Sequence, residues 1–375
     1  MVILNSGTNM ISLTNAKTTH AGVATSGEEE IITTDTRVGE YAVASMIAEP
    51  AVPTIVPVAP SLAFEDEIRY NVYFTALNMG DVTVDNMGLA VFNGKEPEDT
   101  VDTAKELVPG AVFDGEKYMV HTNGIPAKNL GENVCFKVYA KLADGSYVYS
   151  DLLAYNAVAY AKDILANSSD DNMKTLVVSM LNYGAAAQLY FDYNTDALMN
   201  AGLTEEQKAY GVSYSEDMIT PLNGADSNKL GAFAANSGFT AGHPAVSFEG
   251  VFAINYYFTP SYSVDGEMTF YYWTQGDYEA AGVLTAENAS GSMVMTAADG
   301  VYQATVGDIA AKQIDEAVYV VGVYESDGTV YSTGVQVYSL SAYCADRIAN
   351  GSESMQALAK ATVAYGFSAK TYFGI

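Results

Sequence analysis

Hydrophobic and polar residues alternate over short stretches of the chain, and turn signals such as Asp144-Gly145 separate these stretches. Alternation with a period of two, in segments rich in Val, Tyr and Phe, predicts half-buried strands. The predicted strands run from Ile68 to Thr75, Gly88 to Phe92, Tyr118 to Thr122, Val134 to Leu142, Ser146 to Tyr149, Val251 to Phe258, Met268 to Trp273, Ser292 to Thr296, Val301 to Val306 and Ala317 to Tyr324. Short strands at such intervals predict a small antiparallel sandwich in each half of the chain.

After each set of strands the apolar residues change to helical spacing, three or four positions apart. The predicted helices run from Leu152 to Ala166, Met173 to Phe191, Val335 to Ala349 and Met355 to Phe373. Asn167 and Asn350-Gly351 are the expected stops, and Asp170 and Ser352 are the expected N-caps of the helices that follow. Each sandwich is therefore predicted to carry an antiparallel helical hairpin.

The two halves repeat one unit. The segment Tyr183 to Phe191 returns as Tyr365 to Phe373, and Phe64 to Thr75 matches Phe248 to Thr259 at Phe, Glu, Asn, Tyr, Phe and Thr. The predicted fold class is α+β, with two homologous modules. The predicted domains are an extended N-terminal arm and Pro-rich connector (1–60), module 1 (61–191), an inter-module connector (192–244) and module 2 (245–375).

Glycine occupies the middle of the second predicted helix in both copies, at Gly184 and Gly366. A mid-helix glycine costs about 1 kcal/mol relative to alanine, so a compensating interaction is expected. Close approach of another backbone is the favoured reason, with a ligand passing over the glycine as the alternative.

Residues 1–60 are predicted to need support from elsewhere. The first part is rich in Thr, Ser and Ala, apart from a short helix expected from Gly39 to Ala48, and four prolines between Pro50 and Pro60 favour an extended connector. We expect this arm to bind a protein partner or like subunits.

Charge narrows the choice of partners. The 375 residues include 17 Lys and Arg against 45 Asp and Glu, a formal net charge of -28. Such a chain repels phosphates and anionic lipid surfaces, which argues against nucleic acid and membrane partners. No apolar run is long enough to span a bilayer, and the first residues lack the pattern of a signal peptide, so we expect a removed signal or another route of export. Cys135 and Cys344 are expected to be lone buried thiols.

Several segments resemble an uncharacterised repeated module found in large extracellular proteins of anaerobic gut bacteria. They are Ile125-Pro126-Ala127-Lys128, Asp144-Gly145, and Leu181 to Gln188 followed by Tyr193 to Asp196. The resemblance covers about 61 to 375. It implies a non-catalytic surface or structural role and supplies no catalytic residues. A standalone copy with an N-terminal arm also suits a virion protein, such as a fibre or decoration protein of a phage that infects such bacteria.

Motifs for catalysis are not found. His20, His121 and His243 are isolated, and the sequence contains no nucleophile elbow, phosphate loop or dinucleotide fingerprint. We therefore predict that the chain is not an enzyme and holds no cofactor. The abundant carboxylates leave a glycosidase pair open.

Two weaker signals concern metal ions and glycans. Asp192, Asn194 and Asp196 resemble the start of a calcium loop, but the later positions depart from it, so a helix-terminating turn is favoured. Tyr271 and Trp273 would share one strand face and could stack on sugar rings if exposed, although a core position is favoured.

A third signal is a set of residues kept in both copies. Glu65, Asn71 and Lys128 return as Glu249, Asn255 and Lys312. A buried lysine with a lowered pKa can join an asparagine with help from an acid, so internal isopeptide bonds are a hypothesis. An ordinary ion pair of lysine with glutamate is the favoured alternative.

Taken together, the sequence predicts a non-catalytic extracellular structural or attachment protein, displayed on a bacterial surface or phage particle through its arm. A glycan-binding module that uses exposed strand aromatics is the first alternative, and a glycoside hydrolase is the second.

Overall fold

The structure is a computed structural model that describes residues 2–6, 9–13, 52–58, 60–65, 67–92, 100–233, 238–248, 251–264, 266–326 and 328–375. The chain divides into two compact units, Met1–Ala51 and Val52–Ile375. In the first unit, β1 (Val2–Ser6) pairs antiparallel with β2 (Asn9–Leu13). The helix predicted from Gly39 to Ala48 lies outside the described residues. Within the predicted arm and connector, Thr54–Pro57 is not a free connector, because it forms a strand that pairs with Phe74 to Leu77 of module 1.

Module 1 contains two five-stranded antiparallel sheets. The first has the order β3-β5-β9-β8, with β4 also paired to β5, and the second has the order β11-β10-β6-β7, with β12 also paired to β10. Their bounds are β3 (Thr54–Pro57), β4 (Ser61–Ala63), β5 (Arg69–Leu77), β6 (Met87–Phe92), β7 (Glu106–Pro109), β8 (Val112–Phe113), β9 (Tyr118–His121), β10 (Val134–Lys141), β11 (Tyr147–Tyr149) and β12 (Leu153–Tyr155). The alternating residues Tyr70, Val72 and Phe74 of β5 are fully buried in one cluster with Leu89 and Val138 of the other sheet. The two sheets thus pack face to face, as the alternation predicts.

Module 2 repeats this strand order. One sheet runs β13-β15-β19-β18 with β14 on β15, and the other runs β17-β16-β20-β21 with β22 on β20. The bounds are β13 (Phe239–Ala241), β14 (Ala245–Ser247), β15 (Phe252–Pro260), β16 (Thr269–Trp273), β17 (Gly291–Val294), β18 (Thr296–Ala298), β19 (Val301–Ile309), β20 (Val318–Ser326), β21 (Thr329–Ser332) and β22 (Gln336–Tyr338). A short helix, α4 (Gln275–Ala280), follows β16. The expectation of an α+β protein with sandwich-like sheets is confirmed.

The helices also occur in matching pairs. They are α1 (Ala157–Asn167), α2 (Asp171–Tyr190), α5 (Leu340–Asn350) and α6 (Glu353–Phe373). Asp170 and Ser352 cap α2 and α6 through their side chains, as predicted. The predicted starts of the two shorter helices at Leu152 and Val335 are wrong, because the residues there form β12 and β22 and pair with β10 and β20.

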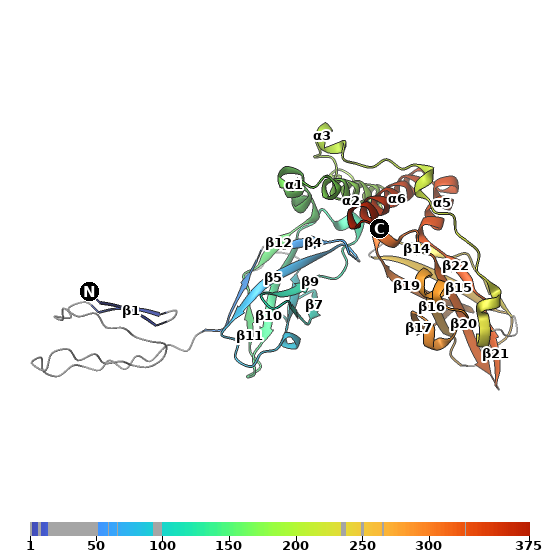
Figure 1. The fold of residues 1–375 in the computed structure, drawn as a ribbon, viewed down its shortest axis with the longest axis horizontal. Coiled ribbons are helices and arrows are strands. Elements are labelled where there is room, and N and C mark those ends of the chain that lie inside the picture. The colour runs from blue at the N-terminus through green and yellow to red at the C-terminus, as the bar shows by residue number, and fades with distance from the viewer. Residues whose placement is uncertain are drawn as a thin grey trace, which may run out of the picture. The chain divides into compact units, whose positions relative to one another are not determined.

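Helices α2 and α6 join the two modules (Figure 1). The Tyr183 and Tyr365 rings stack at 5.5 Å between centroids with 6° between planes, and the Ser179 and Ser368 hydroxyls lie 2.8 Å apart. One hydrophobic core runs through this contact, since Leu176 and Leu358 belong to the same buried cluster. A cavity of about 20 Å³ beside the two tyrosines is large enough for about one water, so the contact is closely packed.

The two mid-helix glycines are explained by close backbone approach. A Cβ on Gly366 would lie 2.9 Å from the carbonyl oxygen of Ala311, which begins the 3₁₀ turn η6 (Ala311–Gln313). A Cβ on Gly184 would lie 3.2 Å from the carbonyl oxygen of Ala127, which begins the matching turn η2 (Ala127–Asn129). The favoured sequence interpretation is therefore confirmed in both copies.

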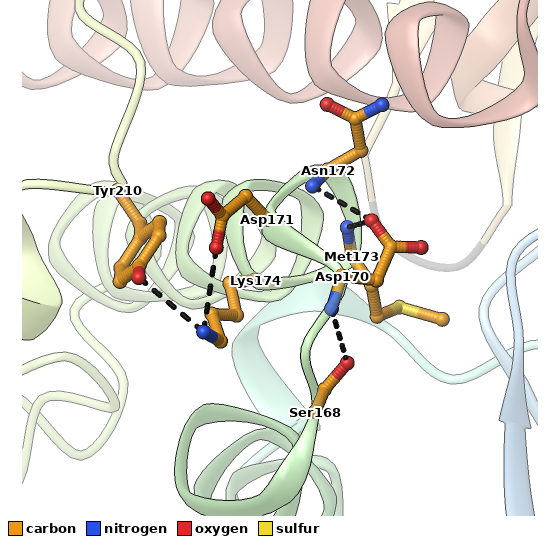
Figure 2. A network of polar contacts seen from close by, with 7 residues as sticks. All are labelled: Ser168, Asp170, Asp171, Asn172, Met173, Lys174 and Tyr210. Atoms are coloured by element: carbon orange, nitrogen blue, oxygen red, sulfur yellow. Dashed lines mark hydrogen bonds and ion pairs between the residues drawn. The ribbon is translucent and has the colours of Figure 1, made fainter.

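The connector between the modules packs on both of them. Its short helical elements are α3 (Glu205–Lys208), η3 (Glu216–Met218) and η4 (Ser227–Phe233), and Thr204 forms a capping box with Gln207. Figure 2 shows that Lys174 of α2 contacts Tyr210 of the connector, 3.3 Å from its hydroxyl, near the Asp170 cap. Further turns are η1 (Val84–Asn86) and η5 (Ala286–Asn288).

Candidate functional site

Trp273 of module 2 takes the core position that the sequence favours, so the alternative glycan contact is wrong for this residue. Its side chain is 0% exposed, and its indole N–H donates to the Asn288 side chain at 2.9 Å. Phe233 of the connector covers the same strand face and packs against Tyr271 with 5.1 Å between ring centroids. Tyr271 and Trp273 therefore belong to a small hydrophobic core with Phe233 of η4. The connector covers this face of the sheet, which could not be inferred from the sequence.

The predicted calcium-loop residues lie in the turn after α2. Asp192 and Asn194 have positive φ angles of 51° and 48°, a region that Asn and Asp tolerate better than most residues, and Asp196 is exposed. Gln188 holds the turn, because its side-chain amide donates to the Ala197 carbonyl at 3.2 Å. In the described part of the chain, no group of three or more His, Cys, Asp or Glu residues is placed to hold a metal ion.

The residues of the isopeptide hypothesis come from different elements, since Lys128 lies in η2 and Asn71 in β5. The Lys128 amine lies 4.6 Å from the centroid of the Phe191 ring, whereas Asn71 pairs with His121 in the sheet. Glu65 accepts a hydrogen bond from the backbone N–H of Phe64 at 3.3 Å.

The second copy shows the same arrangement. The Lys312 amine lies 4.5 Å from the Phe373 centroid, and the Asn255 side chain bonds to Ser247 and Thr305. Glu249 lies outside the described residues. Lysine recurs because a cation–π contact ties the turn η2 or η6 to the end of α2 or α6. The geometry thus gives a non-covalent role to both lysines, and the isopeptide hypothesis is left to a measurement of intact mass, which would be lower by one ammonia for each bond.

A cleft in module 1 offers a different candidate. It has a volume of about 270 Å³ and lies where β6, β7 and β10 meet the loop after β9. Phe92, Ile125 and Pro126 provide apolar walls. The polar side chains that line it are Lys105, Glu106, Asn123, Asn129, Glu132 and Asn133. A concave site with apolar walls and a few convergent polar groups is the usual form of a small-molecule site.

Two carboxylates of the cleft are held by amides. Glu106 accepts from the Asn123 side chain, and Glu132 accepts from the Asn129 side chain at 3.0 Å. The Tyr193 hydroxyl also donates to Glu132, and this bond raises the pKa of Tyr193. Because both oxygens of Glu132 receive hydrogen bonds, its orientation is fixed.

The matching place in module 2 is filled. Sheet pairing aligns Phe92 with Trp273, and the segment after Trp273 forms α4. From that helix, the Gln275 side chain accepts a hydrogen bond from the backbone N–H of Ala317, which stands where module 1 has Asn133. Gln313 still donates to Glu316 at 3.2 Å, matching the Asn129–Glu132 bond. Burial raises the pKa of Glu316, as expected for a carboxyl that has less access to water.

Sequence reasoning missed the cleft because its residues come from four separate segments of the chain. The available signal was divergence between the copies, since Asn123 and Asn133 stand where module 2 has Gly307 and Ala317. Where one copy has a polar residue and the other copy has a small residue at the matching position, the surfaces of the two modules differ.

A scan against protein-family models gives no match, and neither does a search of the curated proteins. Among solved structures, one described as "Crystal structure of Br derivative BhCBM56" aligns with 28% of this chain and 95% of its own, at 16% sequence identity and a TM-score of 0.20. A likeness this low supports no statement about the fold family or function of this chain. Within the described residues, no helix has the length and apolarity that crossing a bilayer requires.

Proposed function

We propose that this chain is a non-catalytic structural or attachment protein of the extracellular space, displayed on a bacterial surface or a phage particle. Residues 1–60 would bind a protein partner or like subunits. The repeated module of extracellular proteins in gut anaerobes, which the sequence resembles, would be its family. The observation that supports this role is the continuous core that joins the two modules through α2 and α6.

A continuous core suits a mechanical role because it removes the flexible joint between tandem modules. Interfaces between domains of one chain are usually polar and permit relative motion. Here Tyr183 and Tyr365 are buried at the contact, and the pKa of each is raised well above its usual value by loss of hydration. A pair of modules fixed in this way can transmit force or hold a binding surface at a set distance from its anchor.

Labelling of whole cells and particles tests the proposal. Antibody raised against the purified chain is applied to intact cells of the source bacterium, to its phage particles and to permeabilised cells as the control. The proposal expects gold label on intact surfaces or on particles. Label that appears only after permeabilisation would refute the extracellular role.

Glycan binding is the second candidate function. Binding in the cleft of module 1 is favoured over stacking on exposed strand aromatics. Trp273 is buried, whereas the cleft presents amides and carboxylates to solvent. The hydrolase alternative rests on Glu106 and Glu132, the two carboxylates of the same cleft. Assays for new reducing ends on oligosaccharides separate binding from hydrolysis.

A further inference from the structure

We infer that the cleft of module 1 binds a neutral sugar ring, with Asn123, Glu106, Asn129 and Glu132 as its polar contacts. The ligand class and these side chains specify the glycan-binding candidate, on which the assignment rests. It does not depend on where the protein is displayed, so the two proposals can fail separately.

The chemistry of the cleft matches that of a sugar. Each ring hydroxyl donates one hydrogen bond and accepts others, so its binding site needs donors and acceptors side by side. An asparagine amide has two N–H donors and a carbonyl oxygen, of which its bond to a carboxylate uses one donor. The Asn123–Glu106 and Asn129–Glu132 pairs each place such a mixed set at the cleft.

The size and walls of the cleft limit the ligand. A volume of about 270 Å³ lies near the lower end of small-molecule sites, which suits a single ring. Pro126 offers apolar surface for the C–H face of that ring, whereas Ile125, which also lines the cleft, is only 9% exposed. Residues 93–99, which follow Phe92, lie outside the described part of the chain and are not included in the site.

Charge selects among sugars. The chain carries a net charge of -28, and the cleft itself holds two carboxylates and one lysine. Sialic and uronic acids would meet this negative field, whereas neutral sugars do not respond to it. The expected ligand of the cleft is therefore a neutral glycan.

The duplication provides a matched control. Glu316 of module 2 has the same position and the same bond to its amide neighbour as Glu132, but there Gln275 of α4 accepts a hydrogen bond from the adjacent backbone N–H of Ala317. Replacing Glu316 changes the same type of bond without touching the cleft.

The experiment uses the full chain and saturation-transfer NMR with cellobiose, maltotriose, mannobiose and lactose as neutral probes, and sialyllactose and digalacturonic acid as acidic ones. The variants are Asn123→Ala, Glu132→Gln and the control Glu316→Gln. Trp273 fluorescence and circular dichroism check that each variant is folded. Release of reducing ends is measured on the same mixtures.

The inference predicts binding of at least one neutral probe by wild type and by Glu316→Gln. It predicts binding about tenfold weaker for Asn123→Ala, which removes an amide that contacts the ring, and for Glu132→Gln, which replaces a charged acceptor by a neutral one. Binding of none of the neutral probes, or of acidic ones alone, would overturn it. Unchanged affinity in both cleft variants would also overturn it, because the sugar would then bind elsewhere. New reducing ends that disappear in the cleft variants would support the site and refute the non-catalytic function.

Discussion

Replacing Gly366 by alanine should destabilise the protein, while the same change at Gly184 should be nearly neutral. The two glycines occupy matching places in α6 and α2, facing η6 and η2. A methyl group at 366 would overlap the buried Ile314 side chain and lie 2.9 Å from a backbone oxygen. At 184 the nearest atom is the Met199 sulfur at 2.6 Å, and the backbone oxygen lies farther away, at 3.2 Å.

The expected magnitudes follow from two opposing effects. Alanine is better than glycine inside a helix by about 1 kcal/mol. Extra volume in a packed core costs about 1–3 kcal/mol, and a backbone oxygen cannot move aside as a methionine end can. We therefore expect Gly366→Ala to lower the free energy of unfolding by about 1–2 kcal/mol, and Gly184→Ala to change it by less than about 0.5 kcal/mol.

Urea unfolding followed by the fluorescence of Trp273, which is the only tryptophan of the chain, measures both changes. A Gly366→Ala variant more stable than wild type by about 1 kcal/mol would refute the reasoning, because that is the gain expected for an unhindered helix position. An equal decrease in the free energy of unfolding for the two variants would also contradict it, since the added methyl group meets different atoms at the two positions.

Three further predictions concern the interface, the lysines and a thiol. Tyr365→Ala should lower the free energy of unfolding by about 3–5 kcal/mol in urea titrations, because it removes a buried ring at the module contact. Lys312→Met should lower it by about 0.5–2 kcal/mol through loss of the contact with Phe373, and the intact mass of wild type should show no loss of ammonia. Burial raises the pKa of Cys344 to about 12 from its usual value of 9.0, so the folded state keeps a proton that the unfolded state loses. This contribution to stability is full below pH 9.0 and declines as pH rises toward about 12, so Cys344→Ala should flatten the alkaline fall in the urea midpoint.

The repeat made the fold largely predictable, because two copies give the same alternating and helical patterns at matching places. The N-caps Asp170 and Ser352 were predictable from local chemistry. The strands β12 and β22 were not, since each has only three residues and runs directly into a helix. Their strand character comes from pairing with β10 and β20, which is a tertiary effect.

The candidate site was less predictable than the fold. Stacking of a sugar on Trp273 remained an alternative in the sequence, because the sequence does not reveal that Phe233 and α4 pack near its strand. The cleft depends on amides such as Asn123 and Asn129, which are also common in ordinary turns. Only their spatial convergence distinguishes them, and convergence of four segments is a property of the folded chain.

Pulsed thiol labelling across a urea series tests the central claim, that the two modules share one core, most directly. Each module contains one buried cysteine, Cys135 in module 1 and Cys344 in module 2. Mass spectrometry of the labelled peptides reports the two sites separately. The shared core predicts that both thiols become reactive at the same urea concentration. Labelling of Cys135 at a clearly lower or higher concentration than Cys344 would show that the modules unfold independently and would contradict the account.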